Sequence, residues 1–190
     1  MNKHASHLVV AGLLSLPFAV MAHTGHHGQG FADGFAHPFL GIDHLAAMLM
    51  VGIWSVLNTR RVWIAPLTFI LLLTLGALAG QQGFSIPQLE PLVAASVIIL
   101  GVMLMLPFKP GATTSLAVIG AFAFCHGLAH GSELTAGSSI LSGMILGSAL
   151  LHGIGMLIAQ RVLRHRTGWT LRLGQAVALL GSGLLFSALI

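Results

Sequence analysis

The sequence predicts an all-α membrane protein, a polytopic bundle of about six transmembrane helices that follows a cleaved signal peptide. Three observations lead to this fold class. Hydrophobic residues make up 56% of the 190 residues and charged residues only 6%, whereas about a quarter of the residues of a soluble domain are charged. Apolar stretches of near-spanning length follow one another with short connections. Basic and acidic residues fall in alternate connections.

The N-terminal segment has the three parts of a secretory signal. Lys3 supplies a positive charge, residues 8–20 form an apolar core that is short for a membrane span, and small residues precede a cleavage point after Ala22. An uncleaved anchor helix is the alternative interpretation. Cleavage divides the chain into a signal peptide (1–22), a His-rich periplasmic leader (23–36) and a transmembrane domain (37–190).

Six apolar stretches within the transmembrane domain are each long enough, or nearly so, to cross a bilayer as a helix. We expect these spans near residues 38–57, 62–80, 91–108, 112–130, 138–159 and 173–190. The glycine pairs Gly76/Gly80, Gly127/Gly131 and Gly143/Gly147 have the small-xxx-small spacing of close helix crossings.

Charge predicts the orientation of these spans. With the N-terminus in the periplasm, every Lys and Arg of the mature chain falls on the cytoplasmic side, namely Arg60, Arg61, Lys109, Arg161, Arg164, Arg166 and Arg172. The outer segments hold Asp33, Glu90 and Glu133 and no basic residue. This asymmetry follows the positive-inside rule. It predicts a multi-pass protein of the bacterial inner membrane.

The first span begins with ionisable residues that are costly in hydrocarbon unless they bind something or pair with one another. If the helix includes His37, then His37, Gly41, His44 and Met48 share one face. Asp43 lies roughly 100° from His44 around the helix, where it can orient a histidine ring as an acceptor. His37 could instead only cap the helix ahead of Pro38.

The fourth span ends with a second cluster, in which His126, His130 and Glu133 share a helical face. The first span runs inward and the fourth outward, so the two clusters lie at the same outer depth of the membrane. Together they offer up to four imidazoles and two carboxylates, a set suited to divalent nickel, cobalt, zinc or copper. The sequence therefore predicts a metal site formed by His37, Asp43, His44, His126, His130 and Glu133.

Two further histidines are weaker candidates. His152 lies deep in the fifth span, too far inward to join the outer cluster, and could line the inward path beside Gly153 and Gly155 or simply hydrogen-bond between helices. His23 would carry a free amine after cleavage and could chelate an ion, or belong to an untethered polar leader.

Several function classes are disfavoured. The basic residues are few and dispersed, which argues against nucleic-acid binding, and no Walker motif supports nucleotide binding. The single cysteine, Cys125, excludes an intramolecular disulfide and a multi-cysteine metal site.

The two motifs resemble those of the HupE/UreJ family of nickel and cobalt permeases. The first-span pattern HPxxGxDH matches at His37, Pro38, Gly41, Asp43 and His44, and HGxAHGxE matches from His126 to Glu133. The resemblance extends over essentially the whole chain. It implies secondary uptake of Ni²⁺ or Co²⁺ for hydrogenase or urease maturation, with the six residues named above as transport residues.

We therefore expect a transporter rather than an enzyme, with the metal ion as its substrate and no permanently bound cofactor. The principal alternative is a membrane electron-transfer protein with bis-histidine haem ligation. The carboxylates beside the histidines suit a hard or borderline cation better. A metallohydrolase with Glu133 as general base is a third hypothesis, although the chain has no HExxH motif.

Overall fold

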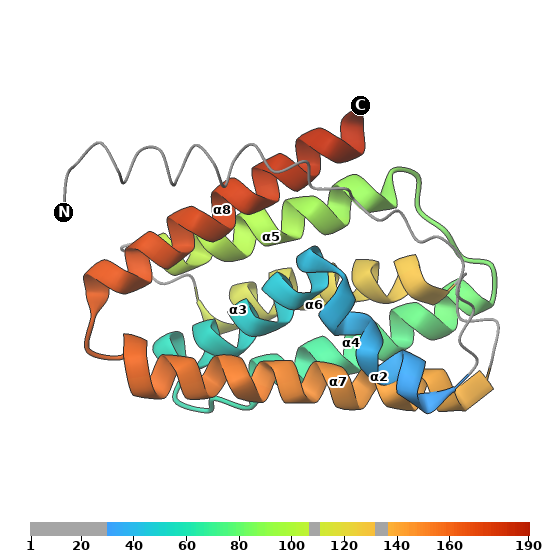
Figure 1. The fold of residues 1–190 in the computed structure, drawn as a ribbon, viewed down its shortest axis with the longest axis horizontal. Coiled ribbons are helices and arrows are strands. Elements are labelled where there is room, and N and C mark those ends of the chain that lie inside the picture. The colour runs from blue at the N-terminus through green and yellow to red at the C-terminus, as the bar shows by residue number, and fades with distance from the viewer. Residues whose placement is uncertain (1–29, 107–110, 132–136) are drawn as a thin grey trace.

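The computed structural model describes residues 30–106, 111–131 and 137–190, and all regular structure within them is helical. Figure 1 shows the helices packed side by side as a bundle. In chain order they are α2 (Phe31–Leu40), α3 (Ile42–Asn58), α4 (Ile64–Gln81), α5 (Leu89–Met105), α6 (Ala112–Gly131), α7 (Gly137–Ile158), the π-helical turn η1 (Ala159–Leu163) and α8 (Thr167–Leu189).

The helices have the length and composition of membrane spans. Four segments are long and apolar enough to cross a bilayer: α4, α6, Ser138–Leu163 (α7 with η1) and α8. The pair α2 and α3 would form a fifth, broken span. The remaining expected span, the third, corresponds to α5, which has 17 residues and lies at the short end of the range for a transmembrane helix. The fold is thus a polytopic helical membrane bundle, whereas the number of six crossings stays a prediction.

The first expected span is not one continuous helix, and this corrects the predicted stripe of His37, Gly41, His44 and Met48. The chain bends by 83° between α2 and α3, because Gly41 adopts an extended conformation with φ −84° and ψ 119°. His37 is no cap either, since α2 already begins at Phe31, within the segment expected as a leader. The functional residues of this region therefore belong to two helices of different direction.

Glycines allow the helix pairs to approach backbone to backbone, as the small-xxx-small spacing predicts. A Cβ atom at Gly76 would overlap the carbonyl oxygen of Phe124, and one at Gly127 would overlap that of Leu73. A Cβ atom at Gly143 would likewise overlap the carbonyl oxygen of Phe31. The pairs α4 with α6 and α2 with α7 depend on these close contacts.

The direction of each packed pair agrees with alternating crossings. Gly76 meets Phe124 and Gly80 meets Gly131, so α4 and α6 run in the same direction, as the second and fourth spans should. Gly101 meets Gly174 while Gly181 meets Ile98, so α5 and α8 run in opposite directions.

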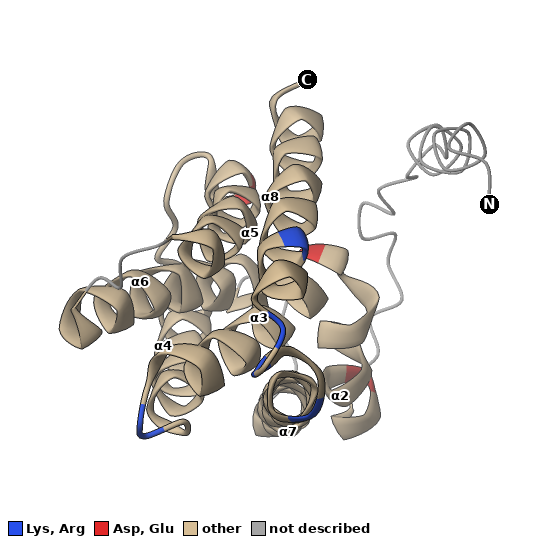
Figure 2. Cartoon of the chain, turned by 90° about the vertical axis from the view of Figure 1, so that its left-hand side faces the viewer, with Lys and Arg blue, Asp and Glu red and all other residues tan. Residues whose placement is uncertain are grey.

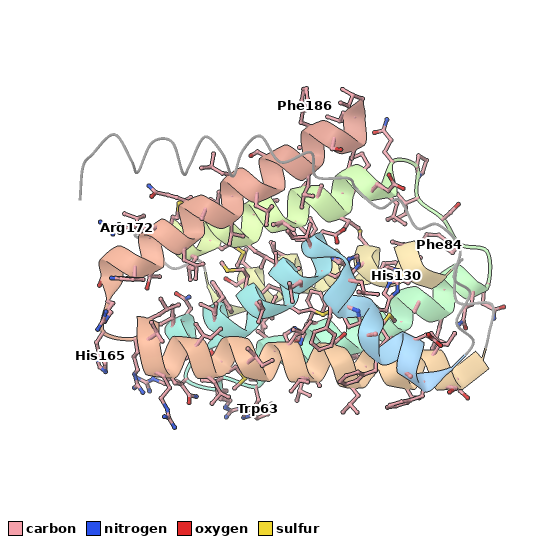
Figure 3. The ribbon with its side chains drawn as sticks, viewed as in Figure 1. Trp63, Phe84, His130, His165, Arg172 and Phe186 are labelled. Carbon is pink, nitrogen blue, oxygen red and sulfur yellow. The ribbon has the colours of Figure 1, made fainter. Side chains whose placement is uncertain are left out.

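The arginines of the described residues gather toward one end of the bundle. They are Arg60 and Arg61 between α3 and α4, Arg161 in η1, and Arg164, Arg166 and Arg172 around the start of α8. Figure 2 looks onto this end. In Figure 3, His165 and Arg172 lie at this end, whereas His130 lies toward the other. The arginines and the histidine-bearing end of α6 therefore lie toward opposite ends of the long axis of the molecule.

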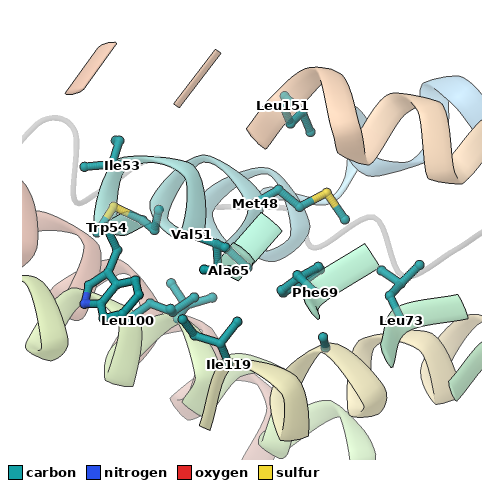
Figure 4. Close-up of a cluster of buried hydrophobic side chains, with 14 of the residues drawn as sticks. Met48, Val51, Ile53, Trp54, Ala65, Phe69, Leu73, Leu100, Ile119 and Leu151 are labelled. Carbon is teal, nitrogen blue, oxygen red and sulfur yellow. The ribbon is translucent and has the colours of Figure 1, made fainter. Parts of the chain in front are cut away.

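The core surrounds α3, whose Met48, Val51 and Trp54 are buried against apolar side chains of neighbouring helices, including Phe69 and Leu73 of α4 (Figure 4). The periphery is apolar as well, with Leu71 and Phe186 well exposed. Exposed apolar side chains on the outside of an apolar bundle are the expected surface toward lipid.

Candidate metal site

Four histidine rings from three helices meet where α2, α3 and α6 converge. His37 lies in the last turn of α2, His44 in the first turn of α3, and His126 and His130 near the end of α6. We call these four residues the histidine cluster. Ring centroids lie 4.3 Å apart for His37 and His130, 4.4 Å for His44 and His130, and 4.8 Å for His44 and His126. The structure thus brings together the two motifs that are far apart in the sequence.

Three of these rings form a hydrogen-bonded chain that ends on a carboxylate. The Nε2 atom of His37 lies 3.0 Å from Nδ1 of His130, and Nε2 of His130 lies 2.5 Å from Nε2 of His44. Nδ1 of His44 in turn lies 2.7 Å from Oδ1 of Asp43. The same oxygen accepts the backbone N–H of His44 at 2.8 Å, which satisfies one of the free amides at the start of α3.

One assignment of protons gives every bond in this chain a donor when the rings are neutral and Asp43 is ionised. His44 donates Nδ1–H to Asp43, so its Nε2 carries a lone pair. His130 then donates Nε2–H to His44 and accepts at Nδ1 from His37. Asp43 therefore acts as the predicted acceptor that sets the tautomer of a histidine, and through His44 it sets the tautomers of the other two.

The bend at Gly41 makes this arrangement possible. A Cβ atom at Gly41 would lie 2.8 Å from Oδ1 of Asp43 and 3.0 Å from Nδ1 of His44. The extended backbone at Gly41 also lets α2 leave α3 at a steep angle, so that His37 faces His130 rather than lying about two helical turns from His44 on one continuous helix.

His126 completes the histidine cluster in a different way. Its Nδ1 lies 2.9 Å from the carbonyl oxygen of Phe122, four residues earlier on α6. With Nδ1–H as the donor, Nε2 carries a lone pair, and this buried atom has no hydrogen-bond partner among the described residues. The ring packs edge-on against His44 and also contacts Phe69, at 5.7 Å between centroids.

Three residues of the histidine cluster are deeply buried, whereas His37 is half-buried. Relative exposure is 5% for His44, 0% for His126 and 3% for His130. Polar groups buried among apolar side chains are costly without partners, so a concentration of imidazoles here needs a reason beyond packing.

The rings of His37, His130 and His44 are paired through their nitrogens rather than aimed at a common point. In the described parts of the chain, no three His, Cys, Asp or Glu side chains are arranged so that they could together hold a metal ion. The bond between His130 and His44 occupies two Nε2 atoms that could each serve as a ligand. A bound ion therefore requires this bond to open.

The remaining candidates from the sequence lie elsewhere. Met48 is fully buried in the apolar core. His152 is 1% exposed and contacts Phe69 on α4, whose ring also touches His126. His23 and Glu133 lie outside the described residues. Sequence reasoning missed Phe69, because an apolar residue on an apolar helix carries no signal of a site.

Comparisons with known proteins agree with the two motifs. The family described as "HupE / UreJ protein" matches residues 11–184. "Protein HupE" of Rhizobium leguminosarum bv. viciae is 33% identical over 188 residues, which cover 96% of this chain and 98% of that protein. No solved structure matches. With a family match over nearly the whole chain and a full-length relative, this protein belongs to the HupE/UreJ family.

Proposed function

We propose that this protein is a secondary transporter that takes up a divalent transition metal ion, Ni²⁺ or Co²⁺, across the bacterial inner membrane. The metal would serve the maturation of hydrogenase or urease. The observation that carries this proposal is the histidine cluster, in which four imidazoles from three helices meet beside a carboxylate within a membrane bundle.

The donor set suits the proposed substrate. Imidazole nitrogen is a good ligand for nickel, cobalt, zinc and copper, whereas magnesium and calcium prefer oxygen. Asp43 holds Nδ1–H of His44 and so presents the Nε2 lone pair of that ring. Metal-bound histidines generally have such an acceptor on their second nitrogen.

Ion binding would rearrange the hydrogen-bonded chain. An ion at Nε2 of His44 takes the place of the N–H that His130 donates, and His130 must then turn away or lose that proton. His126 needs no such exchange, because its Nε2 lone pair is already unoccupied. We propose that His126 and His44 bind the ion first and that His130 and His37 follow.

The charge distribution supports the orientation that uptake requires. The arginine-rich end would face the cytoplasm under the positive-inside rule. The histidine cluster lies toward the other end, where Figure 3 shows His130. It would then be loaded from the periplasm, as uptake requires, with the N-terminus on that same side.

The haem alternative fits the geometry poorly. A bis-histidine haem needs two rings on opposite faces of a porphyrin, whereas the rings of His37, His44 and His130 pack directly on one another at 4.3 and 4.4 Å. The metallohydrolase hypothesis gains no observation from the structure, because Glu133 lies outside the described residues. We therefore propose transport rather than catalysis.

Uptake of radiolabelled metal tests this function. Cells with and without the protein are compared for accumulation of nickel, cobalt, zinc and copper at equal concentration. We expect nickel or cobalt to accumulate only when the protein is present. Equal accumulation of all four ions in both strains would refute the proposal, and a Soret band in the purified protein would favour haem instead.

A further inference from the structure

His126 and His152 have the same local geometry, although they lie on different helices. Each ring has its Nδ1 within hydrogen-bond distance of a carbonyl oxygen four residues earlier: Phe122 for His126, at 2.9 Å, and Ser148 for His152, at 2.7 Å. In both, Nε2 is buried and has no hydrogen-bond partner among the described residues. Each ring therefore presents an oriented, unused lone pair.

A helix-packing role does not account for this geometry. A histidine that links helices uses its outward nitrogen to hydrogen-bond across the interface. In His152, Nδ1 is instead hydrogen-bonded to a carbonyl oxygen of its own helix, and Nε2 has no partner among the described residues. A buried polar atom without a partner is costly. A backbone acceptor on one nitrogen and a free lone pair on the other is also the arrangement of a metal-binding histidine before it binds.

His152 lies deeper in the bundle than the histidine cluster. A Cβ atom at Gly52 of α3 would overlap the carbonyl oxygen of His152, so these two backbones touch. Gly52 follows His44 by eight residues along α3, which corresponds to about 12 Å at 1.5 Å per residue. The backbone of His152 therefore lies closer to the arginine-rich end of α3 than His44 does.

One aromatic ring contacts both histidines. The centroid of Phe69 is 5.7 Å from that of His126 and 5.1 Å from that of His152. Phe69 is 1% exposed, and Figure 4 shows it among the core side chains between α4 and α3. The imidazole rings of His126 and His152 therefore share their contact with one apolar ring.

We propose that His152 is a second cation-binding site on the transport path and that the ring of Phe69 closes the path between it and His126. The ion passes from His126 to His152 when the Phe69 side chain moves aside. While Phe69 stays in place, the transport path is not open to both sides of the membrane at once. This inference rests on the proposed function and deepens it.

Accessibility of position 152 tests the barrier without any metal. The reporter is His152→Cys in a Cys125→Ser background, placed in sealed vesicles and treated with a small cationic thiol reagent from the histidine-cluster side. We expect slow labelling when Phe69 is present and severalfold faster labelling in Phe69→Ala. Phe69→Leu, which retains most of the bulk, should label slowly.

Leu100→Ala is the matched control, because Leu100 is equally buried but lies on α5 rather than on α4. It should leave the labelling rate unchanged. Equal labelling of Phe69→Ala and Leu100→Ala, whether both fast or both slow, would overturn the assignment of Phe69 as the barrier.

Transport tests the site itself. His152→Ala should lower nickel uptake by about tenfold or more, as loss of a ligand or of its support does, while Ni²⁺ binding to the purified protein stays close to wild type. His165→Ala, a substitution of an exposed histidine, should leave uptake unchanged. Wild-type uptake in His152→Ala would overturn the second site, as would a loss of Ni²⁺ binding as large as in His44→Ala.

The two proposals fail in different ways. If nickel accumulates equally in cells with and without the wild-type protein, the proposed function is wrong. If His44→Ala stops uptake and His152→Ala does not, only the second site is wrong.

Discussion

The Nε2 atoms of His130 and His44 lie 2.5 Å apart, although 86 positions separate the two residues in the sequence. This contact joins the two motifs of the chain and places both rings on one hydrogen-bonded path to Asp43. Because each nitrogen is occupied by the other ring, the proposed cation would have to break this contact.

Removal of either ring of this contact should stop transport. His44→Ala and His130→Ala each delete a ligand and leave the other ring with a broken bond, so we expect nickel uptake to fall to the level of cells without the protein. The measurement is radiolabelled uptake normalised to the amount of protein in the membrane. Cys125→Ser, a change beside His126 that removes no proposed ligand, should transport at a rate near wild type; wild-type uptake in both histidine variants would contradict the assignment.

Asp43→Asn should weaken metal binding without removing a proposed direct ligand of the ion. The amide still accepts a hydrogen bond from His44 but no longer carries the charge that supports Nδ1–H, and such supporting partners change affinity by about 10–100-fold. Titration of the purified protein with Ni²⁺ measures the effect. Asp33→Asn on the exposed first turn of α2 serves as control, and equal affinity in the two variants would count against the role of Asp43.

Gly41→Ala should disrupt the site with a single methyl group. The added Cβ would lie 2.8 Å from Oδ1 of Asp43 and 3.0 Å from Nδ1 of His44, so the pair must shift and the bond between His44 and His130 lengthens. We expect uptake to fall severalfold. Gly153→Ala, which would meet no atom within 4 Å, provides the comparison, and equal uptake in these two variants would show that Gly41 does not shape the site.

The signal peptide gives a prediction that does not depend on metal. If cleavage follows Ala22, mass spectrometry of the purified protein should find His23 as the first residue. Ala22→Arg should block processing and leave a heavier chain in the membrane. A mature wild-type chain that still begins at Met1 would establish an anchor helix instead.

The sequence is most informative where a pattern of residue types depends on whether lipid or water surrounds the chain. The apolar stretches, the restriction of arginine to alternate connections and the glycine spacing each follow from local chemistry in lipid and water, so they predicted the membrane bundle and its close helix crossings. The histidines were likewise visible as candidates, because ionisable side chains in apolar stretches are rare. The equal depth of the two clusters followed from counting spans.

Tertiary structure alone decided how those residues meet. A helical wheel placed His37 and His44 on one continuous face, but the bend at Gly41 puts them on separate helices, and whether a glycine bends depends on what packs around it. The chain of bonds from His37 to Asp43 and the contacts of Phe69 with His126 and His152 depend on ring orientations set by packing between α2, α3, α4, α6 and α7. Periodicity shows which face a side chain occupies on its own helix, whereas the partner across an interface is selected by the crossing of the helices.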